Sequence, residues 1–514
     1  MPEETRDLSI GGALDLGVQF AMSGQHENAI GLFRGVLIHE PENFEAIERL
    51  GASLFETRRI HEALYWFWRG RRLNRRHPMA LTNYGLCVCD LGHPEEGVVD
   101  LERAVRNAEK MPELSPEAKA LCYSNLGNTL EKLHRYEDAL VALDKAVTIN
   151  PKDNFPHYNR GIVLLRLNRQ AEGIASLERA IEINPNDADA HYNRGMARLL
   201  RGDLKGGFED YEYRLVTSSN DVMNLGLPAQ NKWHGTEPLV GKTILVHCEQ
   251  GLGDDIQFFR FLPELIRMAD PAKVLLICHS AVRPLLAPME RVTVLPPGHT
   301  FHHNDYDYWV ASMSLPLCLG TTEATIPAPW HPVIEPERIE KWFSAVRSPE
   351  RGICTVGVCW AGNFQHKNNR HRSIDLKDFS RVFAARGCSF VSVQQVVSGD
   401  AELFVDIQAK NANVRAFKFD DFRDTGAALL NCDIVLSVDT AVAHLSASLG
   451  IATWILIPCF GCDWRWQLER IDSPWYPSAR LIRQDRIGDW APTLKDVTEA
   501  LEKEAESRSA KGGH

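Results

Sequence analysis

A glycine recurs at a nearly constant interval between residues 17 and 195. Four of the five intervals are 34 residues, and the third is 42 because eight extra residues fall near the turn-rich segment 111–116. A fixed period of this length is typical of a chain that repeats one supersecondary unit, so this part of the chain is not a single conventional globular core. The glycines are Gly17, Gly51, Gly85, Gly127, Gly161 and Gly195.

Other positions keep the same phase. A small residue stands twelve residues after each glycine and a large apolar one four residues later, and Pro41, Pro151 and Pro185 end three units. Small residues let two antiparallel helices approach closely, and stacked neighbours bury the apolar face that one unit cannot bury alone. The pattern resembles the tetratricopeptide repeat, and we expect it over residues 10–221. The large residues are Phe33, Phe67, Leu101, Leu143, Leu177 and Tyr211.

Asparagines form a second series, two residues before the repeat glycine, whereas the first two units carry Asp15 and Arg49 there. A side-chain amide both donates and accepts hydrogen bonds, so it can hold a peptide backbone or join neighbouring repeats, and both interpretations stay open. The array resembles that of the O-GlcNAc transferases, and the resemblance implies that these asparagines line a concave groove and hold an acceptor. They are Asn83, Asn125, Asn159 and Asn193.

The pattern changes after Tyr211. Residues 222–242 are rich in Gly and Pro, and short apolar strands then alternate with helical stretches, which is typical of parallel sheets covered on both faces. We therefore predict an α + α/β fold: a repeat solenoid over residues 10–221, a linker over 222–242, two Rossmann-like lobes over 243–335 and 336–502, and a disordered tail over 503–514. The expected strands cover residues 243–248, 273–278, 355–359, 390–393, 433–437 and 453–457.

The amino-acid composition restricts the classes of partner and the cellular compartment that we expect. The net charge of −11 argues against broad binding to nucleic acid or anionic membrane. We expect no signal peptide and no membrane span, because no apolar stretch is long enough. The twelve cysteines lie mostly in apolar runs, which favours buried thiols in a cytoplasmic protein. Cys459 and Cys462 form a lone C-x-x-C, a weak sign of a redox or zinc role.

The first of three polar loops follows strand 243–248 and runs from Glu249 to Asp255. Ligands of parallel sheets lie at the carboxyl ends of the strands, so these loops are the expected site. Asp254 and Asp255 open the next helix, whose dipole stabilises a carboxylate. Either aspartate is therefore a helix cap or a general base.

The second and third loops favour an anionic ligand. Residues 360–373 follow strand 355–359 and hold a basic cluster that includes Lys367 and Arg372, which suits a phosphate. Asp439 and Thr440 follow strand 433–437 and precede a helix whose N–H groups can receive a phosphate. His444 lies one turn further along that helix and can face the same ligand.

Seven ordered motifs are together similar to the bacterial tetratricopeptide-repeat glycosyltransferases, whose catalytic region is heptosyltransferase-like with a GT-B fold and some of which modify flagellin. The resemblance implies that Asp254 is the base. The family tends to have Gly in place of Ala441, and Thr in place of Asp255, which leaves the choice of aspartate open. The motifs are Trp233–Gly235, Glu249–Phe258, Trp360–Asn363, Arg372–Ile374, Ser437–Thr440, Asp463–Trp466 and Ser473–Pro477. The implied donor-binding residues are Asn363, Lys367, Arg372, Ser373, Asp439, Thr440, His444 and Trp464.

The expected function is transfer of a sugar from a nucleotide-activated donor to a hydroxyl of an acceptor, a protein such as flagellin held by the repeats. Cationic side chains stabilise the leaving group, so no metal or cofactor is expected. Asp305–Asp307 fits the metal motif D-x-D only weakly, and Trp464 is equally an ordinary core residue. One alternative is an interaction scaffold with an inactive catalytic region, and another is an enzyme with a glycan acceptor. The donor, the acceptor and the oligomeric state stay open.

Overall fold

The computed structural model describes residues 9–217, 227–296, 299, 302, 304–362, 369–394 and 400–511. The chain forms two compact units, residues 1–190 and residues 191–514. The first is entirely helical where it is described, and the second holds two parallel β-sheets. A helical tetratricopeptide-type solenoid therefore precedes an α/β region, as the repeat period and the apolar strands predict.

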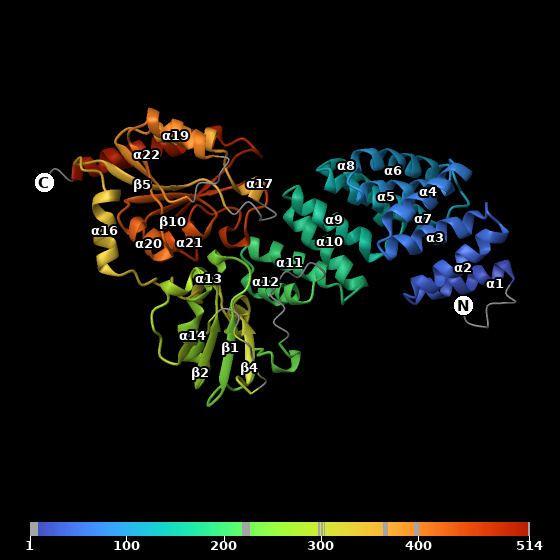
Figure 1. Cartoon of the computed structure of the whole chain (residues 1–514), viewed down its shortest axis with the longest axis horizontal. Coiled ribbons are helices and arrows are strands. Elements are labelled where there is room, and N and C mark those ends of the chain that lie inside the picture. The colour runs from blue at the N-terminus through green and yellow to red at the C-terminus, as the bar shows by residue number, and fades with distance from the viewer. Residues whose placement is uncertain are drawn as a thin grey trace. The chain divides into compact units, whose positions relative to one another are not determined.

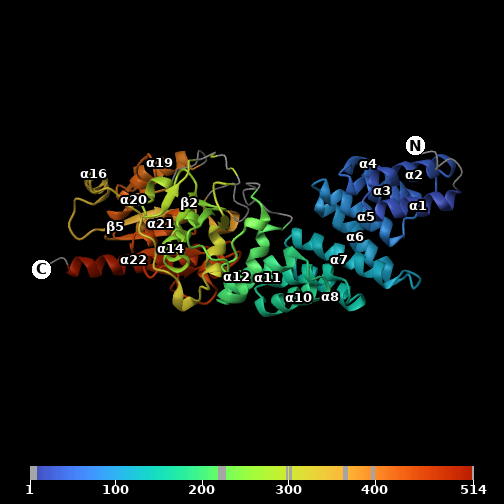
Figure 2. The ribbon, with the colours of Figure 1, turned by 90° about the horizontal axis from the view of Figure 1, so that it is seen from below.

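The first unit consists of antiparallel helix pairs that follow one another along the chain (Figures 1 and 2). The eight extra residues of the third interval fall where α6 ends and the long helix α7 begins, with Ser115 as its N-terminal cap. The helices are α1 (Ile10–Met22), α2 (His26–His39), α3 (Phe44–Glu56), α4 (Ile60–Leu73), α5 (Pro78–Asp90), α6 (Pro94–Glu109), α7 (Pro116–Lys132), α8 (Tyr136–Ile149), α9 (Asn154–Arg166) and α10 (Gln170–Ile183).

The repeat glycines lie where two helices of a pair touch. A β-carbon on Gly161 would lie 2.7 Å from Cγ of Leu177, and one on Gly17 would lie 2.6 Å from the ring of Phe33. These distances are shorter than van der Waals contact, so only glycine fits. The small–large spacing therefore has the structural meaning that the sequence predicts.

The last helix pair belongs largely to the second unit. It consists of α11 (Ala188–Leu200) and α12 (Leu204–Tyr211), and the 3₁₀ turn η2 (Glu212–Leu215) follows. Phe208 and Tyr211 lie edge-on to the ring of Trp464, with centroids 5.6 and 6.1 Å away. This pair is built on the repeat pattern, yet its apolar side chains join the core of the α/β region.

Two all-parallel sheets form the rest of the second unit, with orders β3-β2-β1-β4 and β10-β9-β8-β5-β6-β7. The six expected strands correspond to β1, β2, β5, β6, β8 and β9. The four that the sequence pattern does not predict are the edge strands of both sheets. The strands are β1 (Thr243–His247), β2 (Lys273–Ile277), β3 (Val292–Val294), β4 (Tyr308–Ala311), β5 (Cys354–Cys359), β6 (Cys388–Ser392), β7 (Val414–Ala416), β8 (Ile434–Val438), β9 (Thr453–Ile457) and β10 (Ala479–Arg483).

Helices cover both sheets of the second unit, and α13 packs directly on α21, so the two lobes meet there (Figure 1). The helices are α13 (Leu252–Phe258), α14 (Phe261–Ala269), α15 (Leu315–Cys318), α16 (Pro336–Val346), α17 (Asn369–Arg372), α18 (Leu376–Phe379), α19 (Ala401–Lys410), α20 (Phe422–Leu430), α21 (Ala441–Ser448) and α22 (Ala491–Lys511).

The described part of the expected linker, residues 227–242, is packed against the first lobe. Trp233 is buried, and its backbone N–H donates to the carbonyl of Trp309 at 2.8 Å. Gly235 has a φ of 87°, and a β-carbon there would lie 2.5 Å from the carbonyl oxygen of Cys318. The Trp-His-Gly motif is thus explained by packing.

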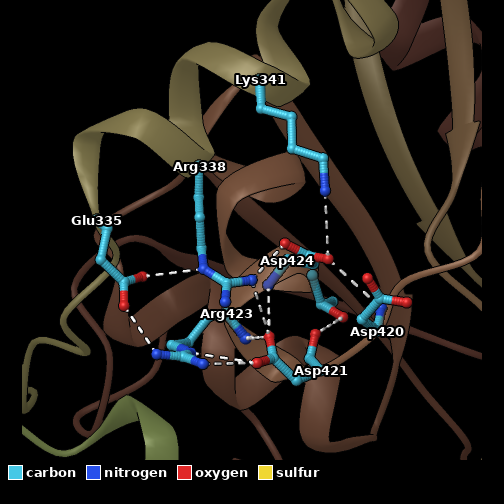
Figure 3. A network of polar contacts seen from close by, with 8 residues as sticks. Glu335, Arg338, Lys341, Asp420, Asp421, Arg423 and Asp424 are labelled. Atoms are coloured by element: carbon cyan, nitrogen blue, oxygen red, sulfur yellow. Dashed lines mark hydrogen bonds and ion pairs between the residues drawn. The ribbon is translucent and has the colours of Figure 1, made fainter.

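A network of charges joins α16 to α20 in the second lobe (Figure 3). Arg338 on α16 donates to the buried Asp424 at 2.6 Å, and Arg423 bridges Glu335 and Asp421. Asp421 also caps α20 by accepting from the N–H groups of its first turn. These contacts fix the segment that leads into the second lobe.

The prediction of a disordered tail from residue 503 is wrong as far as residue 511. Helix α22 continues to Lys511 because its inner face has partners. Leu501 and Ala505 are buried against the second lobe, and Arg508 bonds to Asp433 at 3.3 Å. In the described ranges, no helix has both the length and the apolar character that a bilayer span requires.

Candidate active site

The first and third polar loops meet where α13 lies against α21. A β-carbon on Gly253 would lie 2.6 Å from Cδ2 of His444, so only glycine permits this approach. The loop after β1 and the loop after β8 are therefore parts of one place in the second unit.

Asp254 stands in the first turn of α13. One of its oxygens accepts from the backbone N–H of Gly251 at 2.7 Å and closes the start of the helix. The other accepts from the guanidinium of Arg465, which belongs to the second lobe. The side chain is 17% exposed, and burial raises the pKa of the Asp254 carboxyl while Arg465 opposes that shift. The carboxylate is both a helix cap and an ion-pair partner across the lobes.

Asp255, the neighbouring aspartate, is turned toward the first lobe. Its side chain is fully buried, and one oxygen accepts from the backbone N–H of His279 at 2.9 Å and lies 2.9 Å from Nδ1 of the same histidine. This hydrogen bond raises the pKa of His279. The structure thus places Asp254, and not Asp255, against the second lobe.

Arg465 lies in the 3₁₀ turn η8 (Trp464–Trp466), beyond β9. Its side chain bonds to both oxygens of Asp463 at 3.0 Å, to Asp254 and to the amide oxygen of Gln257. Gln257 is on α13 and is buried. One arginine therefore contacts polar side chains of both lobes.

Asp439 and His444 lie beside this ion pair. Burial and the charge of Asp463 raise the pKa of Asp439 to about 7, so its carboxyl exchanges a proton near neutral pH. Burial and the cation of Arg465 hold the pKa of His444 well below its usual range. The Nδ1 atom of His444 lies 2.9 Å from the hydroxyl of Tyr476, and its Nε2 lies 3.9 Å from Asp439.

The second loop is described only at its two ends. The guanidinium of Arg372 lies over Gly362, where a β-carbon would meet Nη2 at 2.7 Å. Its Nε is buried and makes no hydrogen bond in the described structure, and its charge lowers the pKa of Asp439. Ser373 accepts from the N–H of Gly362 at 3.0 Å and donates to Asn369 at 2.7 Å. The predicted donor residues Asn363 and Lys367 lie outside the described residues.

Thr440 and Trp464 are the remaining predicted donor-binding residues, and they have different surroundings. Thr440 is the N-terminal cap residue of α21, and its hydroxyl oxygen lies 3.1 Å from that of Ser437. Trp464 is 1% exposed among Phe208, Tyr211 and Trp475. Its ring has no free face in this structure, which supports the packing interpretation of Trp464.

The asparagine series is not uniform. Asn83 donates to Glu48 at 2.7 Å, so it joins two repeats. Asn159 is buried, and its Nδ2 has no hydrogen-bond partner in the described structure. Asn125 and Asn193 are half-buried. Asn83 therefore fits the structural interpretation, whereas the Nδ2 of Asn159 is buried and has no hydrogen-bond partner among the described residues.

Several weaker motifs have structural surroundings. Asp307 accepts from Lys242 at 3.0 Å and from the N–H of Thr243 at 2.8 Å, so it fixes the start of β1. All twelve cysteines lie in the described ranges and are unpaired. Cys462 donates to the carbonyl of Asp463 at 3.2 Å, while Cys459 is exposed. Groups of three or more His, Cys, Asp or Glu that could hold a metal ion are absent from the described residues.

Sequence reasoning missed the arginine at the centre of the site. The motif Asp463–Trp466 contains Arg465, but only the two tryptophans around it suggest a ligand contact by residue type. The tyrosine of the motif Ser473–Pro477 was missed likewise, and Tyr476 proves to be the partner of His444. The one sequence signal for this position was the arginine itself. An arginine flanked by two tryptophans is buried only when acidic or polar side chains pair with it, so it predicts such partners.

Comparison with known proteins identifies the repeats. A tetratricopeptide repeat model matches residues 120–153, and a TPR repeat model matches residues 163–202. Repeats of this class stack into extended surfaces that bind other proteins. The helices within residues 120–153 and 163–202 are thus tetratricopeptide repeats, and the helices before them form the same kind of helical solenoid.

Relatives extend over more of the chain. Protein FlbA of Caulobacter vibrioides is 27% identical over 332 residues, which cover 59% of this chain and 53% of that protein. The chain thus spans about half the length of this curated relative. Among solved structures, a tetratricopeptide-repeat protein of Thermus thermophilus is 20% identical, with 37% of this chain and all of that chain covered and a TM-score of 0.33. MamA of Desulfovibrio magneticus is 19% identical, with 34% and 95% covered and a TM-score of 0.29.

Proposed function

We propose that the chain is a glycosyltransferase that moves a sugar from a nucleotide-activated donor to a hydroxyl of a protein acceptor bound by the repeats. The observation that carries this proposal is the contact of Asp254 with the second lobe. An acidic group from the loop after β1 meets Arg465, beside Asp439 and His444 from the loop after β8. Such loops, at the carboxyl ends of parallel strands, are where α/β sheets bind ligands.

The chemistry needs few groups. Asp254 takes the proton of the acceptor hydroxyl as its oxygen attacks the anomeric carbon. The bond from that carbon to the donor phosphate breaks, and the nucleotide leaves with the electron pair. Arg372, whose Nε has no hydrogen-bond partner among the described residues, is suited to stabilise the charge that develops on the phosphate. The carboxyl of Asp439, with a pKa of about 7, is a second group that can exchange a proton.

The acceptor side rests on the repeats. Tetratricopeptide repeats bind protein partners, and the buried Nδ2 of Asn159, which has no hydrogen-bond partner among the described residues, can bond to a peptide carbonyl once the side chains around it move. The resemblance to flagellin-modifying enzymes makes flagellin the first acceptor to test. We expect Asn159→Ala to raise the KM for the protein acceptor and to leave release of the donor nucleotide unchanged.

The test of the transferase proposal is Asp254→Asn. Donor cleavage is followed as release of nucleotide from UDP-, GDP-, ADP- and CMP-linked sugars. We expect the rate to fall by roughly 10²- to 10⁴-fold, the usual contribution of acid–base catalysis. Asp255→Asn is the matched neighbour, and its effect should arise mainly through stability. Unchanged turnover in Asp254→Asn removes Asp254 from the mechanism.

One observation favours a different function, an interaction scaffold with an inactive catalytic region. Both oxygens of Asp254 are engaged, one by Gly251 and one by Arg465. Two surface depressions, beside Lys495 and beside Met289, are lined by other residues. Calorimetry with the four nucleotides separates the two functions, because an inactive scaffold without a donor site binds none of them.

A further inference from the structure

Arg465 occupies the point where polar side chains of the two lobes converge, and it is 4% exposed. Its Nη1 donates to both oxygens of Asp463, its Nη2 to Asp254 and its Nε to Gln257. A guanidinium presents its N–H groups in a fixed planar fork, so its orientation is set by three partners at once.

Aromatic rings also hold this guanidinium. Its central carbon lies 4.5 Å from the ring centre of Trp464 and 5.5 Å from that of Phe258. Phe258 belongs to α13 in the first lobe, and Trp464 belongs to the second. A lysine carries the charge but neither the planar fork nor the stacking face. The position is therefore built for arginine.

We propose that Arg465 is a positioning residue that holds the ionised carboxylate of Asp254 in place against the second lobe. Its role in turnover rests on the proposed function, whereas its role in holding a buried carboxylate does not. Removal of the cation leaves two half-buried carboxylates, Asp254 and Asp463, with backbone N–H donors but without this positive charge beside them. Buried charges without a partner are costly, and protonation relieves that cost.

The neighbouring ionisable groups respond in a consistent direction. Arg465 lowers the pKa of Asp254, of Asp439 and of His444. Its loss should therefore raise all three pKa values, and the two carboxyls would hold their protons to higher pH. The other charged or titratable groups described near this cluster include Tyr192, Tyr211, Asp255, Arg260, His279, Arg372, Cys462, Asp463 and Tyr476.

The test compares the full-length chain with Arg465→Gln at two pH values. At about pH 8, where the carboxylates are charged, we expect the melting temperature of the variant to fall by roughly 5 °C or more. At about pH 5 the difference from the unsubstituted chain should shrink, because the raised pKa values allow protonation of the freed carboxylates. A loss of equal size at both pH values overturns the proposal.

Arg415→Gln is the matched control. Arg415 lies in the same lobe, and its guanidinium bonds to the carbonyls of Ala345 and Val346 and to the hydroxyl of Ser389, all uncharged. Its loss should lower the melting temperature by the same amount at both pH values. A double variant, Asp254→Asn with Arg465→Gln, should recover part of the loss at about pH 8, because it removes a stranded carboxylate as well. This variant also serves if Arg465→Gln alone does not fold.

Turnover provides the second readout. In Arg465→Gln, donor cleavage should fall by roughly 10²-fold, and the acid limb of its pH profile should move to higher pH. In Arg465→Lys the acid limb should return close to its original pH, because the positive charge is kept. The rate should recover less, because lysine lacks the planar set of N–H donors. If the unsubstituted chain cleaves none of the four donors, the proposed function fails while the stability comparison still decides the role of Arg465. An unmoved acid limb in an active Arg465→Gln overturns the positioning role.

Discussion

The helix pairs of the first unit and the last pair, α11 with α12, follow the same sequence pattern. They differ in the core that their side chains join. In the first unit many charges form exposed local pairs such as Arg169 with Glu172, three residues apart, while Asp100 is buried with Arg71 and Arg103. In the last pair the buried Asp210 accepts from Arg194 and Arg198, at distances of 2.7 and 2.9 Å. The repeat packs into its own helical stack in one place and is part of an α/β core in the other.

The difference shows what the repeat pattern determines. Its glycines mark where the two helices of a pair touch, against the Leu177 side chain at Gly161 and against the backbone of Tyr211 at Gly195. The positions between them are free to be charged and solvated or to join another core. The last pair uses that freedom, because Phe208 and Tyr211 pack on Trp464, next to the arginine of the candidate site. Stability of the last pair and integrity of the site are therefore linked.

The largest expected effect comes from Arg214→Ala in the turn after the last pair. Arg214 is buried, and its Nη2 donates to the fully buried Glu249 at 2.5 Å and to Ser314 at 2.9 Å. Removal of one partner leaves a buried charge, so the free energy of unfolding should fall by roughly 3–5 kcal/mol. Arg169→Ala, which breaks an exposed pair of the first unit, should give no measurable change in the same denaturant titration. Equal effects would erase the contrast between the regions.

Two partly buried glutamates, Glu48 in the first unit and Glu212 in the second, should respond to pH in opposite directions. Burial raises the pKa of Glu48 in the first unit to about 7, from an ordinary value of 4.5. The folded state therefore binds the proton more tightly, and the first unit should lose about 2–3 kcal/mol as pH rises from 4.5 through 7. In Glu48→Gln that pH dependence should disappear, as followed by unfolding at a series of pH values.

Glu212 gives the opposite sign in the second unit. Burial favours its protonated form, but Arg214 and Lys232 prevail and lower its pKa to about 2. The stability that it contributes is complete above its ordinary pKa of 4.5 and is lost as pH falls toward 2. Glu212→Gln should remove this part of the pH dependence in unfolding titrations, and an unchanged pH dependence in that variant would contradict the assignment.

The smallest expected effects concern the shared glycines. Gly161→Ala should cost roughly 1–2 kcal/mol, since the new β-carbon meets Leu177. Gly195→Ala should cost more, because its β-carbon would lie 2.8 Å from the backbone nitrogen of Tyr211, which cannot rotate away. Gly31→Ala is the control. Its β-carbon meets nothing within 4 Å, and Ala should stabilise helix α2 by up to about 1 kcal/mol. Melting temperatures of the three variants rank these costs.

The sequence predicts those strands that are buried on both faces of their sheet. The six predicted strands are interior strands of their sheets, and they read as apolar runs because helices cover both faces. The four missed strands, β3, β4, β7 and β10, are all edges. Three of them are only three or four residues long, and β10 contains two arginines, so no continuous apolar signal marks them.

The residues of the candidate site also divide into those that the sequence suggests and those that it does not. Asp254, Arg372, Asp439 and His444 lie in the loop, or in the first helix, that follows a predicted interior strand, so position and residue type together suggest them. Arg465 lies beyond β9 and acquires its partners only when two lobes pack together, with Gln257 more than two hundred residues away in sequence. A contact of that range leaves no local pattern. The surroundings of Asp255 are equally non-local, since they depend on His279.

The location of the donor can be measured directly. The nucleotide among the UDP, GDP, ADP and CMP forms that raises the melting temperature most is bound to the full-length chain and crystallised with it. We predict that its phosphates lie beside Arg372 and Thr440, on the side of the second lobe that faces Asp254. Phosphates bound elsewhere, or no rise in melting temperature with any of the four, would contradict a glycosyl-transfer site at the meeting of α13 and α21.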